Sequence, residues 1–343
     1  MQNAADTEQM ATSAPSAPEL SVVVPVFNEA GNVGPLLARL TPILESCVSS
    51  FEVVFVDDGS SDETMTAVRA ENLRDPRVRA VSFSRNFGKE IAIAAGLDHC
   101  AGRAAVIMDA DLQHPPETIP VFVAKWREGY QNVYGQRTHR TTDSALRRML
   151  SQRFYDLFRA FGETRLPEGA GDFRLLDRRA IEPLLAMRER ARFSKGLYAW
   201  VGFKSIGVPF EVAERASGES KFSYRKLTRF ALDGLMSFST LPLKVWTYIG
   251  TVVSGFAFAT ALFYLVRTMT HGVDVPGYAS LIVSVMFFSG VQLLSLGVLG
   301  EYIGRIFAEV KRRPLYIVAE RVGAVESGAE GDHPVPTRHR LGG

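Results

Sequence analysis

Two aspartates one residue apart, Asp109 and Asp111, directly follow the apolar run Ala104–Met108. The run is typical of a buried strand, so it would deliver both carboxylates to the end of that strand. Because an unpaired buried carboxylate costs several kcal/mol, two acids at such a place predict a shared cation. Mg²⁺ and Mn²⁺ prefer oxygen ligands and commonly bridge protein carboxylates to substrate phosphates. The spacing therefore predicts a divalent-metal site that handles a phosphate-containing substrate.

Two more polar clusters follow apolar runs earlier in the chain. Asn28 and Glu29 come after the first run, and Asp57 and Asp58 come after the second. An acidic side chain at the end of a strand can accept hydrogen bonds from ribose hydroxyls or from a base N–H. Asp57 and Asp58 are therefore candidates for contact with a nucleoside, whereas Asn28 could equally start a turn and Glu29 could be solvated.

Residues 20–135 alternate short apolar runs with amphipathic segments, and this alternation predicts the elements that position the clusters. The expected strands are Leu20–Val26, Glu52–Val56, Val78–Phe83, Ala104–Met108 and Asn132–Tyr134, separated by helices at about 32–46, 62–73, 87–99 and 117–128. A βαβα rhythm indicates the α/β class with a mostly parallel sheet. Ligands of such sheets bind beyond the carboxyl ends of the strands, so the three clusters should meet at one edge. The segment 144–240 is less regular and contains at least one strand, Ile206–Val212.

Two long stretches without a charged residue follow, Val245–Val266 and Val275–Gly300. The shorter has 22 residues, and at about 1.5 Å per residue a helix of that length spans a hydrocarbon core of about 30 Å. The stretches predict two membrane-spanning helices. Basic residues before the first span and at 311–313 after the second place the large domain and both termini in the cytoplasm.

Overall composition narrows the function further. Lys and Arg total 39 against 37 Asp and Glu, a net charge of +2, which argues against a nucleic-acid-binding protein. The two cysteines, Cys47 and Cys100, form no metal-binding pattern and are expected to be small buried thiols.

Four segments in this order and spacing, VVPVFNE, VDDGSSDET, NFGKEIAIAAGLDHC and MDADLQHPPE, resemble glycosyltransferase family 2 with the GT-A (Rossmann-like) fold. With the two apolar stretches, the chain is similar to the polyprenyl-phosphate glycosyltransferases, the group of dolichyl-phosphate mannose synthase and bactoprenol glucosyltransferase. The resemblance covers about residues 20–318. Together with the polar composition of both ends and the interleaved basic and aromatic residues from Lys221 onward, it divides the chain into a disordered tail (1–19), a GT-A catalytic domain (20–220), amphipathic interfacial helices (221–243), transmembrane helices (244–267 and 276–303), a cytoplasmic juxtamembrane segment (304–321) and a second disordered tail (322–343).

The resemblance also implies roles for individual residues. Asp109, Asp111 and Gln113 would hold Mg²⁺ or Mn²⁺, with His114 behind them. The nucleotide sugar would lie against Pro25, Asn28, Glu29, Asp57, Asp58 and Asp109. The acceptor phosphate would meet Arg137, Arg174, Arg215, Ser220 and Lys221, because arginine suits bidentate phosphate contact. Asp111, Asp172 and Arg137 would be catalytic, with Asp172 expected to orient the acceptor or an arginine more than to abstract a proton. For Lys89 and Asn86 two interpretations stay open, contact with a phosphate and an ordinary position on the surface.

The implied reaction is the inverting transfer of a hexose from a nucleotide sugar to undecaprenyl phosphate at the cytoplasmic face of the membrane. UDP-glucose is the preferred donor; mannose, galactose, GlcNAc and aminoarabinose derivatives stay open. A phosphate monoester has a second pKa of about 6, so the acceptor is already ionised and needs no strong base. Small residues four apart, such as Gly300 and Gly304, favour helix packing and a homo-oligomer.

Two other functions are weaker. A processive polysaccharide synthase would carry a QxxRW motif, and none of Trp126, Trp200 and Trp246 follows an arginine. A membrane-tethered, non-catalytic scaffold would not need intact Asp58, Asp109, Asp111 and Gln113.

Overall fold

The computed structural model describes residues 17–137, 170–190, 192–211, 241–271 and 277–323. Its centre is an eight-stranded mixed sheet with the order β7-β5-β6-β4-β1-β2-β3-β8. Four of the seven strand pairs are parallel and three are antiparallel. The strands are β1 (Leu20–Val26), β2 (Phe51–Asp57), β3 (Val78–Phe83), β4 (Ala104–Ile107), β5 (Asn132–Arg137), β6 (Ala170–Asp177), β7 (Ser205–Phe210) and β8 (Val318–Val322).

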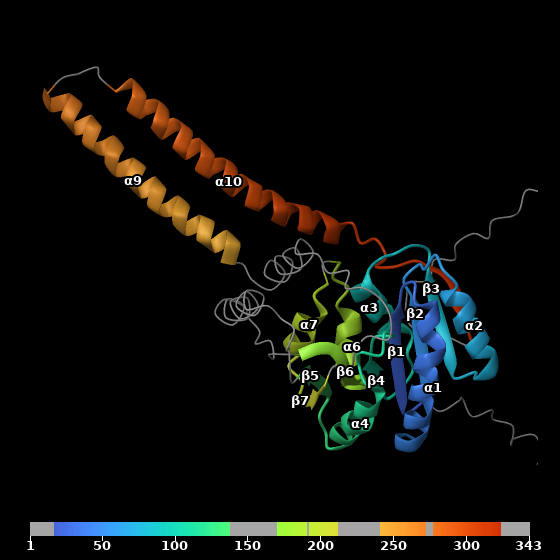
Figure 1. The fold of residues 1–343 in the computed structure, drawn as a ribbon. Helices are drawn as coiled ribbons and strands as arrows, with labels where there is room; N and C mark the ends of the chain where they lie inside the picture. The colour runs from blue at the N-terminus through green and yellow to red at the C-terminus, as the bar shows by residue number, and fades with distance from the viewer. Residues whose placement is uncertain (1–16, 138–169, 191, 212–240, 272–276, 324–343) are drawn as a thin grey trace, which may run out of the picture.

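Helices cover both faces of the sheet (Figure 1). One face carries α1 (Ala30–Cys47), α2 (Thr64–Arg74), η1 (Pro116–Thr118) and α4 (Ile119–Arg127), and the other carries α3 (Lys89–His99), α6 (Arg178–Ala186) and α7 (Ser194–Trp200). Successive residues of β1 enter different cores: Val22 and Val24 pack with α1, and Val23 packs with α3. Burial on both faces explains why the strands are continuous apolar runs in the sequence.

The expected strands and helices between residues 20 and 135 are confirmed, and the strand near Ile206–Val212 is β7. The structure adds two strands that the sequence did not indicate, β6 and β8. β8 follows the second long helix and pairs antiparallel with β3, from Ala80 opposite Val322. Residues expected in a juxtamembrane segment and tail therefore complete the edge of the catalytic sheet. Arg69 and Glu320 form an ion pair of 2.6 Å across this edge.

Two long helices, α9 (Leu241–His271) and α10 (Tyr278–Val310), contact each other and project away from the sheet (Figure 1). Within the described residues one segment, Phe287–Val310 in α10, is long and apolar enough to cross a membrane, judged by its length and composition. The described part of the structure thus has one candidate membrane helix at this end of the chain, where the sequence predicts two spans. Glu301 and Arg305, four residues apart in α10, form an ion pair of 3.1 Å.

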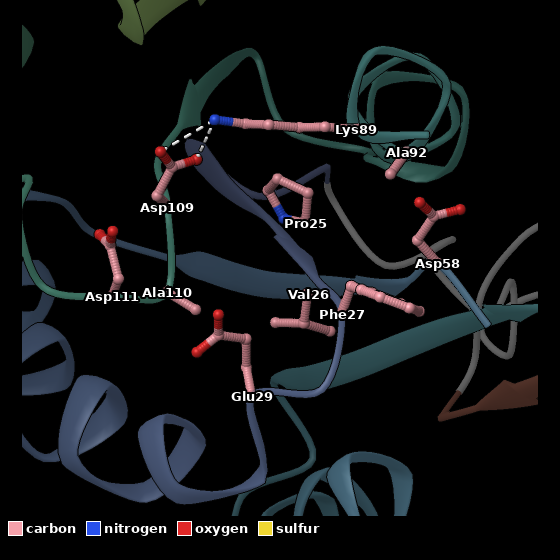
Figure 2. A pocket seen from close by; sticks show the side chains of 10 residues that line it. All are labelled: Pro25, Val26, Phe27, Glu29, Asp58, Lys89, Ala92, Asp109, Ala110 and Asp111. Atoms are coloured by element: carbon pink, nitrogen blue, oxygen red, sulfur yellow. Dashed lines mark hydrogen bonds and ion pairs between the residues drawn. The ribbon is translucent and has the colours of Figure 1, made fainter. Parts of the chain in front are cut away.

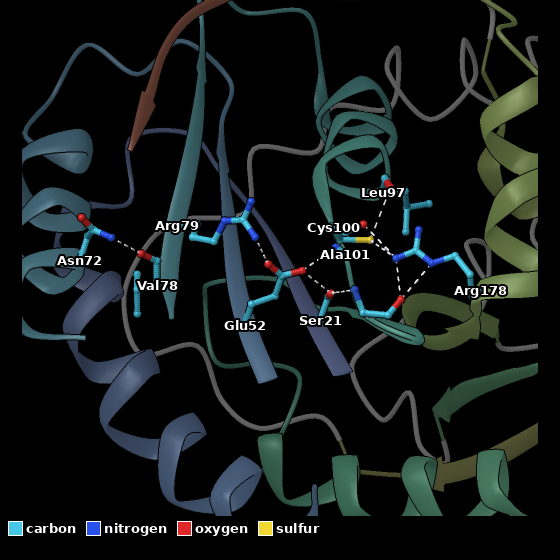
Figure 3. A network of polar contacts seen from close by, with 10 residues as sticks. Ser21, Glu52, Asn72, Val78, Arg79, Leu97, Cys100, Ala101 and Arg178 are labelled. Carbon is cyan, nitrogen blue, oxygen red and sulfur yellow. Dashed lines mark hydrogen bonds and ion pairs between the residues drawn. The ribbon is translucent and has the colours of Figure 1, made fainter. Parts of the chain in front are cut away.

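A buried polar network lies at the other end of the strands, where β2 begins (Figure 3). The Glu52 carboxylate accepts hydrogen bonds from the Ser21 hydroxyl and the Ala101 N–H, both 2.6 Å, and pairs with Arg79. The Arg178 guanidinium donates to the Cys100 carbonyl at 2.8 Å. These contacts anchor the loop that follows α3, so the helix is held at its C-terminal end.

Both cysteines are free thiols, but only one of them is buried as expected, because Cys47 is half-buried. Cys100 is buried, and burial raises the pKa of its thiol to about 11.

Candidate active site

A cleft of about 210 Å³ opens at the carboxyl ends of β1, β2 and β4 (Figure 2). The predicted meeting of three polar clusters is therefore observed. Of the residues expected at the donor and metal sites, those that line the cleft are Pro25, Glu29, Asp58, Asp109 and Asp111, together with Val26, Phe27, Lys89, Ala92 and Ala110.

Lys89 occupies the centre of the charge arrangement. Its ammonium lies 2.6 Å from Asp109 Oδ1 and 2.9 Å from Asp109 Oδ2, and 3.3 Å from Asp172 Oδ2. Burial alone would lower the pKa of Lys89, but the two carboxylates outweigh it and raise that pKa. The sequence left Lys89 open between phosphate contact and the surface; the structure places it in the cleft.

Asp58 fixes the position of the backbone from which the Lys89 side chain extends. Its carboxylate accepts the N–H groups of Phe87 at 2.6 Å and Gly88 at 2.9 Å. Gly88 has a φ of 102°, a conformation that favours glycine, and it directly precedes α3. Burial, reinforced by the neighbouring Asp57 charge, raises the pKa of Asp58 despite these N–H donors. Asp58 therefore fixes the loop that presents Lys89.

Asp57 and Asn28 serve the turns around the cleft and do not line it. Asp57 is 1% exposed, and its two carboxylate oxygens accept from the Ser60 N–H at 3.0 Å and the Ser82 hydroxyl at 2.6 Å. The Asn28 side chain accepts from the Ser61 N–H at 2.9 Å. In the structure both residues therefore stabilise turns beside the cleft. Their expected contact with the nucleotide sugar stays a prediction.

The segment after β4 holds two of the three expected metal ligands, Asp109 and Asp111, in the cleft (Figure 2). His114 is buried behind it, stacked on Phe173 at 4.9 Å, and its Nδ1 accepts the Asp109 N–H at 3.1 Å. Gln113 is half-buried and outside the cleft lining, with its backbone N–H donating to Asp111 Oδ1 at 3.1 Å. His114 therefore orients the backbone of Asp109, as expected of a residue behind the ligands.

The carboxylate oxygens in the cleft suit a hard divalent ion that also binds oxygen atoms of the substrate. Over the described residues no group of three or more His, Cys, Asp or Glu side chains could hold a metal. Asp109 and Asp111 supply two carboxylates, and Asp109 already binds a cation, the Lys89 ammonium, through both of its oxygens. Because Mg²⁺ in enzymes keeps water and substrate phosphate as ligands, two carboxylates are a sufficient protein contribution.

The side of the site that is expected to face the acceptor is formed by β6 and α7. Lys195 Nζ lies 4.0 Å from Asp172 Oδ1, on the opposite oxygen from Lys89. Burial would raise the pKa of Asp172, but Lys195, Lys89 and Arg174 together hold it well below its usual range. Burial and the Asp172 charge raise the pKa of the neighbouring Glu90. Asp172 is therefore an ionised carboxylate held between lysines.

Arg174 lies deeper than expected of a phosphate ligand. It is 2% exposed, its guanidinium lies 3.8 Å from the centroid of the Tyr198 ring, and it donates to the Gly171 carbonyl at 2.6 Å. The structure places it behind Asp172 and not in the cleft lining. Arg137 ends β5, opposite Phe210. Arg215, Ser220 and Lys221, and the interfacial segment 221–243 up to residue 240, lie outside the described residues.

The sequence analysis missed Lys195, Glu90 and Tyr198. Lys195 and Tyr198 reach the site from α7, far along the chain from the motifs, and no local pattern marks them. Glu90 follows Lys89 inside a recognised segment, but its approach to Ser194, whose N–H it accepts at 3.2 Å, depends on packing.

Comparison with known proteins places these features in a family. Residues 21–185 match the family described as Glycosyl transferase family 2, and residues 241–306 match the family described as GtrB C-terminal hairpin. A solved mannosyltransferase from Pyrobaculum calidifontis, in complex with GDP-Man and Mn²⁺, aligns over 82% of this chain and 84% of its own, with a TM-score of 0.45 and 20% identity.

Two curated relatives match over almost their whole length. An uncharacterised glycosyltransferase of Synechocystis is 47% identical over 305 residues, which cover 89% of this chain and 96% of that protein. The SfII prophage-derived bactoprenol glucosyl transferase of Shigella flexneri is 44% identical over 300 residues, 88% of this chain and 97% of that protein. These matches confirm the resemblance drawn from the four motifs. The chain belongs to glycosyltransferase family 2 and is a glycosyltransferase whose α/β sheet is a GT-A catalytic domain.

Proposed function

We propose that this enzyme transfers a hexose, with glucose as first choice, from a nucleotide sugar to a polyprenyl phosphate, with inversion at the sugar carbon. The observation that carries the proposal is the cleft itself, where Asp109, Asp111 and Lys89 share one space with Asp172 close by. Similarity to the Shigella bactoprenol glucosyl transferase supports glucose and a polyprenyl acceptor. UDP-glucose is the proposed donor.

Asp109 and Asp111 would hold Mg²⁺ or Mn²⁺, with Gln113 as a further oxygen donor from the same segment. The metal, when bound, would stabilise the charge that develops on the departing nucleoside diphosphate. Pro25, Glu29 and Asp58 would line the nucleoside part of the cleft, with Asn28 and Asp57 shaping its turns. Lys89 would add a positive charge near the donor phosphates.

Asp172 is proposed to position cations, and proton abstraction is not its main role. A carboxylate whose pKa is held low is a weak base, and the acceptor phosphate is already ionised. Lys89 and Lys195 each face one oxygen of Asp172. Asp172 therefore holds the positive charge that two approaching phosphate groups require.

The long hairpin is proposed to bring the enzyme to its acceptor. We infer that α9 and α10 both cross the cytoplasmic membrane, with the catalytic domain and both termini in the cytoplasm. The uncharged stretch Val245–Val266 lies in α9, and the match to a hairpin family covers both helices. Arg137, Arg215, Ser220 and Lys221 are proposed to bind the acceptor phosphate, and a homo-oligomer is proposed to form through the helices.

The test is transfer of radiolabelled sugar to undecaprenyl phosphate by the purified full chain with Mg²⁺ or Mn²⁺. The donors compared are UDP-glucose, GDP-mannose, UDP-galactose, UDP-GlcNAc and UDP-aminoarabinose, and NMR of the product reports the anomeric configuration. We expect a β-linked glucosyl lipid. Asp111→Asn should lower turnover by orders of magnitude while the protein still folds; unchanged turnover would reject the metal site. If no donor labels the lipid, the scaffold alternative replaces the proposal.

A further inference from the structure

Lys89 binds Asp109 in the way that a metal ion would. Its ammonium is within 2.9 Å of both carboxylate oxygens, and that carboxylate is one of the two proposed to hold the metal. Since a divalent ion and an ammonium on the same carboxylate repel each other, both cannot keep these contacts at full strength.

A second position for the ammonium lies within reach. Asp172 Oδ2 is 3.3 Å from Lys89 Nζ, and the Lys89 side chain is 44% exposed, which leaves it space to move. The other oxygen of Asp172 has no hydrogen bond within the described residues, and its nearest ion-pair partner there, Lys195, is 4.0 Å away. Asp172 can therefore accept the ammonium more closely when Asp109 releases it.

The backbone that carries Lys89 is held in place, so only the side chain has to move. The N–H groups of Phe87 and Gly88, directly before Lys89, are bound by Asp58. The loop after the other end of α3 is anchored by the network around Glu52 (Figure 3). Four flexible methylene groups separate the fixed backbone from the ammonium.

We propose that Lys89 is a built-in counter-ion that occupies the Asp109 subsite while no metal is bound and moves to Asp172 and the donor diphosphate when the metal enters. This inference rests on the proposed function, because it assumes a metal at Asp109 and Asp111. It makes Lys89 a positioning residue that couples metal entry to the charge facing the acceptor side. Lys89 also lowers the affinity of the enzyme for the metal ion while no nucleotide sugar is bound.

The experiment measures Mn²⁺ binding to the full chain in detergent, without nucleotide, by electron paramagnetic resonance of free Mn²⁺. Lys89→Met removes the competing charge, so we expect Mn²⁺ to bind about tenfold more tightly. Lys89→Arg keeps a cation and should bind Mn²⁺ as the unmodified protein does. Lys195→Met is the matched control, because Lys195 approaches Asp172 and not Asp109; its Mn²⁺ affinity should stay within about twofold. Mn²⁺ affinity that is equal or weaker in folded Lys89→Met overturns the proposal.

Asp111→Asn in the same titration separates the two levels of inference. If Asp111→Asn weakens Mn²⁺ binding but Lys89→Met does not tighten it, the metal site stands and the counter-ion role is rejected. If the Asp111→Asn protein binds Mn²⁺ as the unmodified protein does, the proposed metal site fails, and the counter-ion role fails with it.

Discussion

Gly96 lies where helix α3 passes closest to the sheet, and its replacement by alanine tests how α3 positions Lys89. A Cβ atom at Gly96 would stand 2.1 Å from Val23 Cγ1 of β1, and 3.2 Å from Val56 Cγ2 of β2. Carbon atoms in contact normally lie about 3.5–4.0 Å apart, so α3 has to move outward by roughly 1.5 Å to accept the methyl group.

Two opposing effects set the size of the change in stability. Alanine is favoured over glycine inside a helix by about 1 kcal/mol. Overpacking a closed core costs about 1–3 kcal/mol and sometimes more, and the 2.1 Å contact with a strand side chain belongs at the upper end. We expect Gly96→Ala to lower the free energy of unfolding by about 2 kcal/mol. Because α3 begins at Lys89, and a misplacement of about 1 Å can reduce rates 100-fold, transfer activity should fall by up to about 100-fold.

Thermal and urea unfolding of the full chain in detergent, with sugar transfer measured in parallel, gives both quantities. Gly34→Ala in α1 is the matched control, because the nearest atom to its added Cβ is Glu71 Oε1 at 4.0 Å; it should gain about 0.5–1 kcal/mol. Val23→Ala removes the clashing methyl groups, so adding Gly96→Ala to it should cost far less than adding Gly96→Ala alone. Stabilisation by Gly96→Ala equal to that of Gly34→Ala would refute the close packing of α3 on β1.

Two further predictions concern groups away from the cleft. Glu52→Gln leaves the buried Arg79 guanidinium without its carboxylate. Urea titrations should therefore show that the free energy of unfolding falls by about 3–5 kcal/mol. A loss below about 1 kcal/mol would contradict the stabilising role of the network in Figure 3. Burial would raise the pKa of Glu19, but Arg127 and the Ser49 hydrogen bonds lower it to about 2 from the ordinary 4.5. Since the pKa of Glu19 is lower in the folded state, Glu19 stabilises the fold above about pH 4.5 and loses this contribution as the pH falls towards 2. Glu19→Gln should therefore make the melting temperature depend less on pH over that range. An unchanged dependence of the melting temperature on pH would argue against the Arg127 pair.

Local patterns were enough to predict the half of the catalytic domain that carries the motifs. β1, β2 and β4 consist mainly of apolar residues because both faces of the sheet are covered, and that signal is readable without the fold. Polar residues at the ends of these strands follow the same logic, since parallel strands bring their carboxyl ends together. Glu29, Asp58, Asp109 and Asp111 were predicted to meet at one edge for this reason, and the family resemblance added Pro25.

The contacts that define the chemistry depend on packing between distant segments. Whether Lys89 faces solvent or Asp172 depends on how β6 pairs antiparallel with β4, and the sequence does not specify that register. β8 joins the sheet only after the chain has passed through α9 and α10, because β3 offers an open edge. The amino-acid sequence by itself determined the family, the positions along the chain of the strands that carry the motifs, and the carboxylate pair Asp109 and Asp111. Tertiary structure alone decided that Lys89 binds Asp109 and approaches Asp172, because an ion pair forms only where folding brings separate strands and helices within a few ångströms.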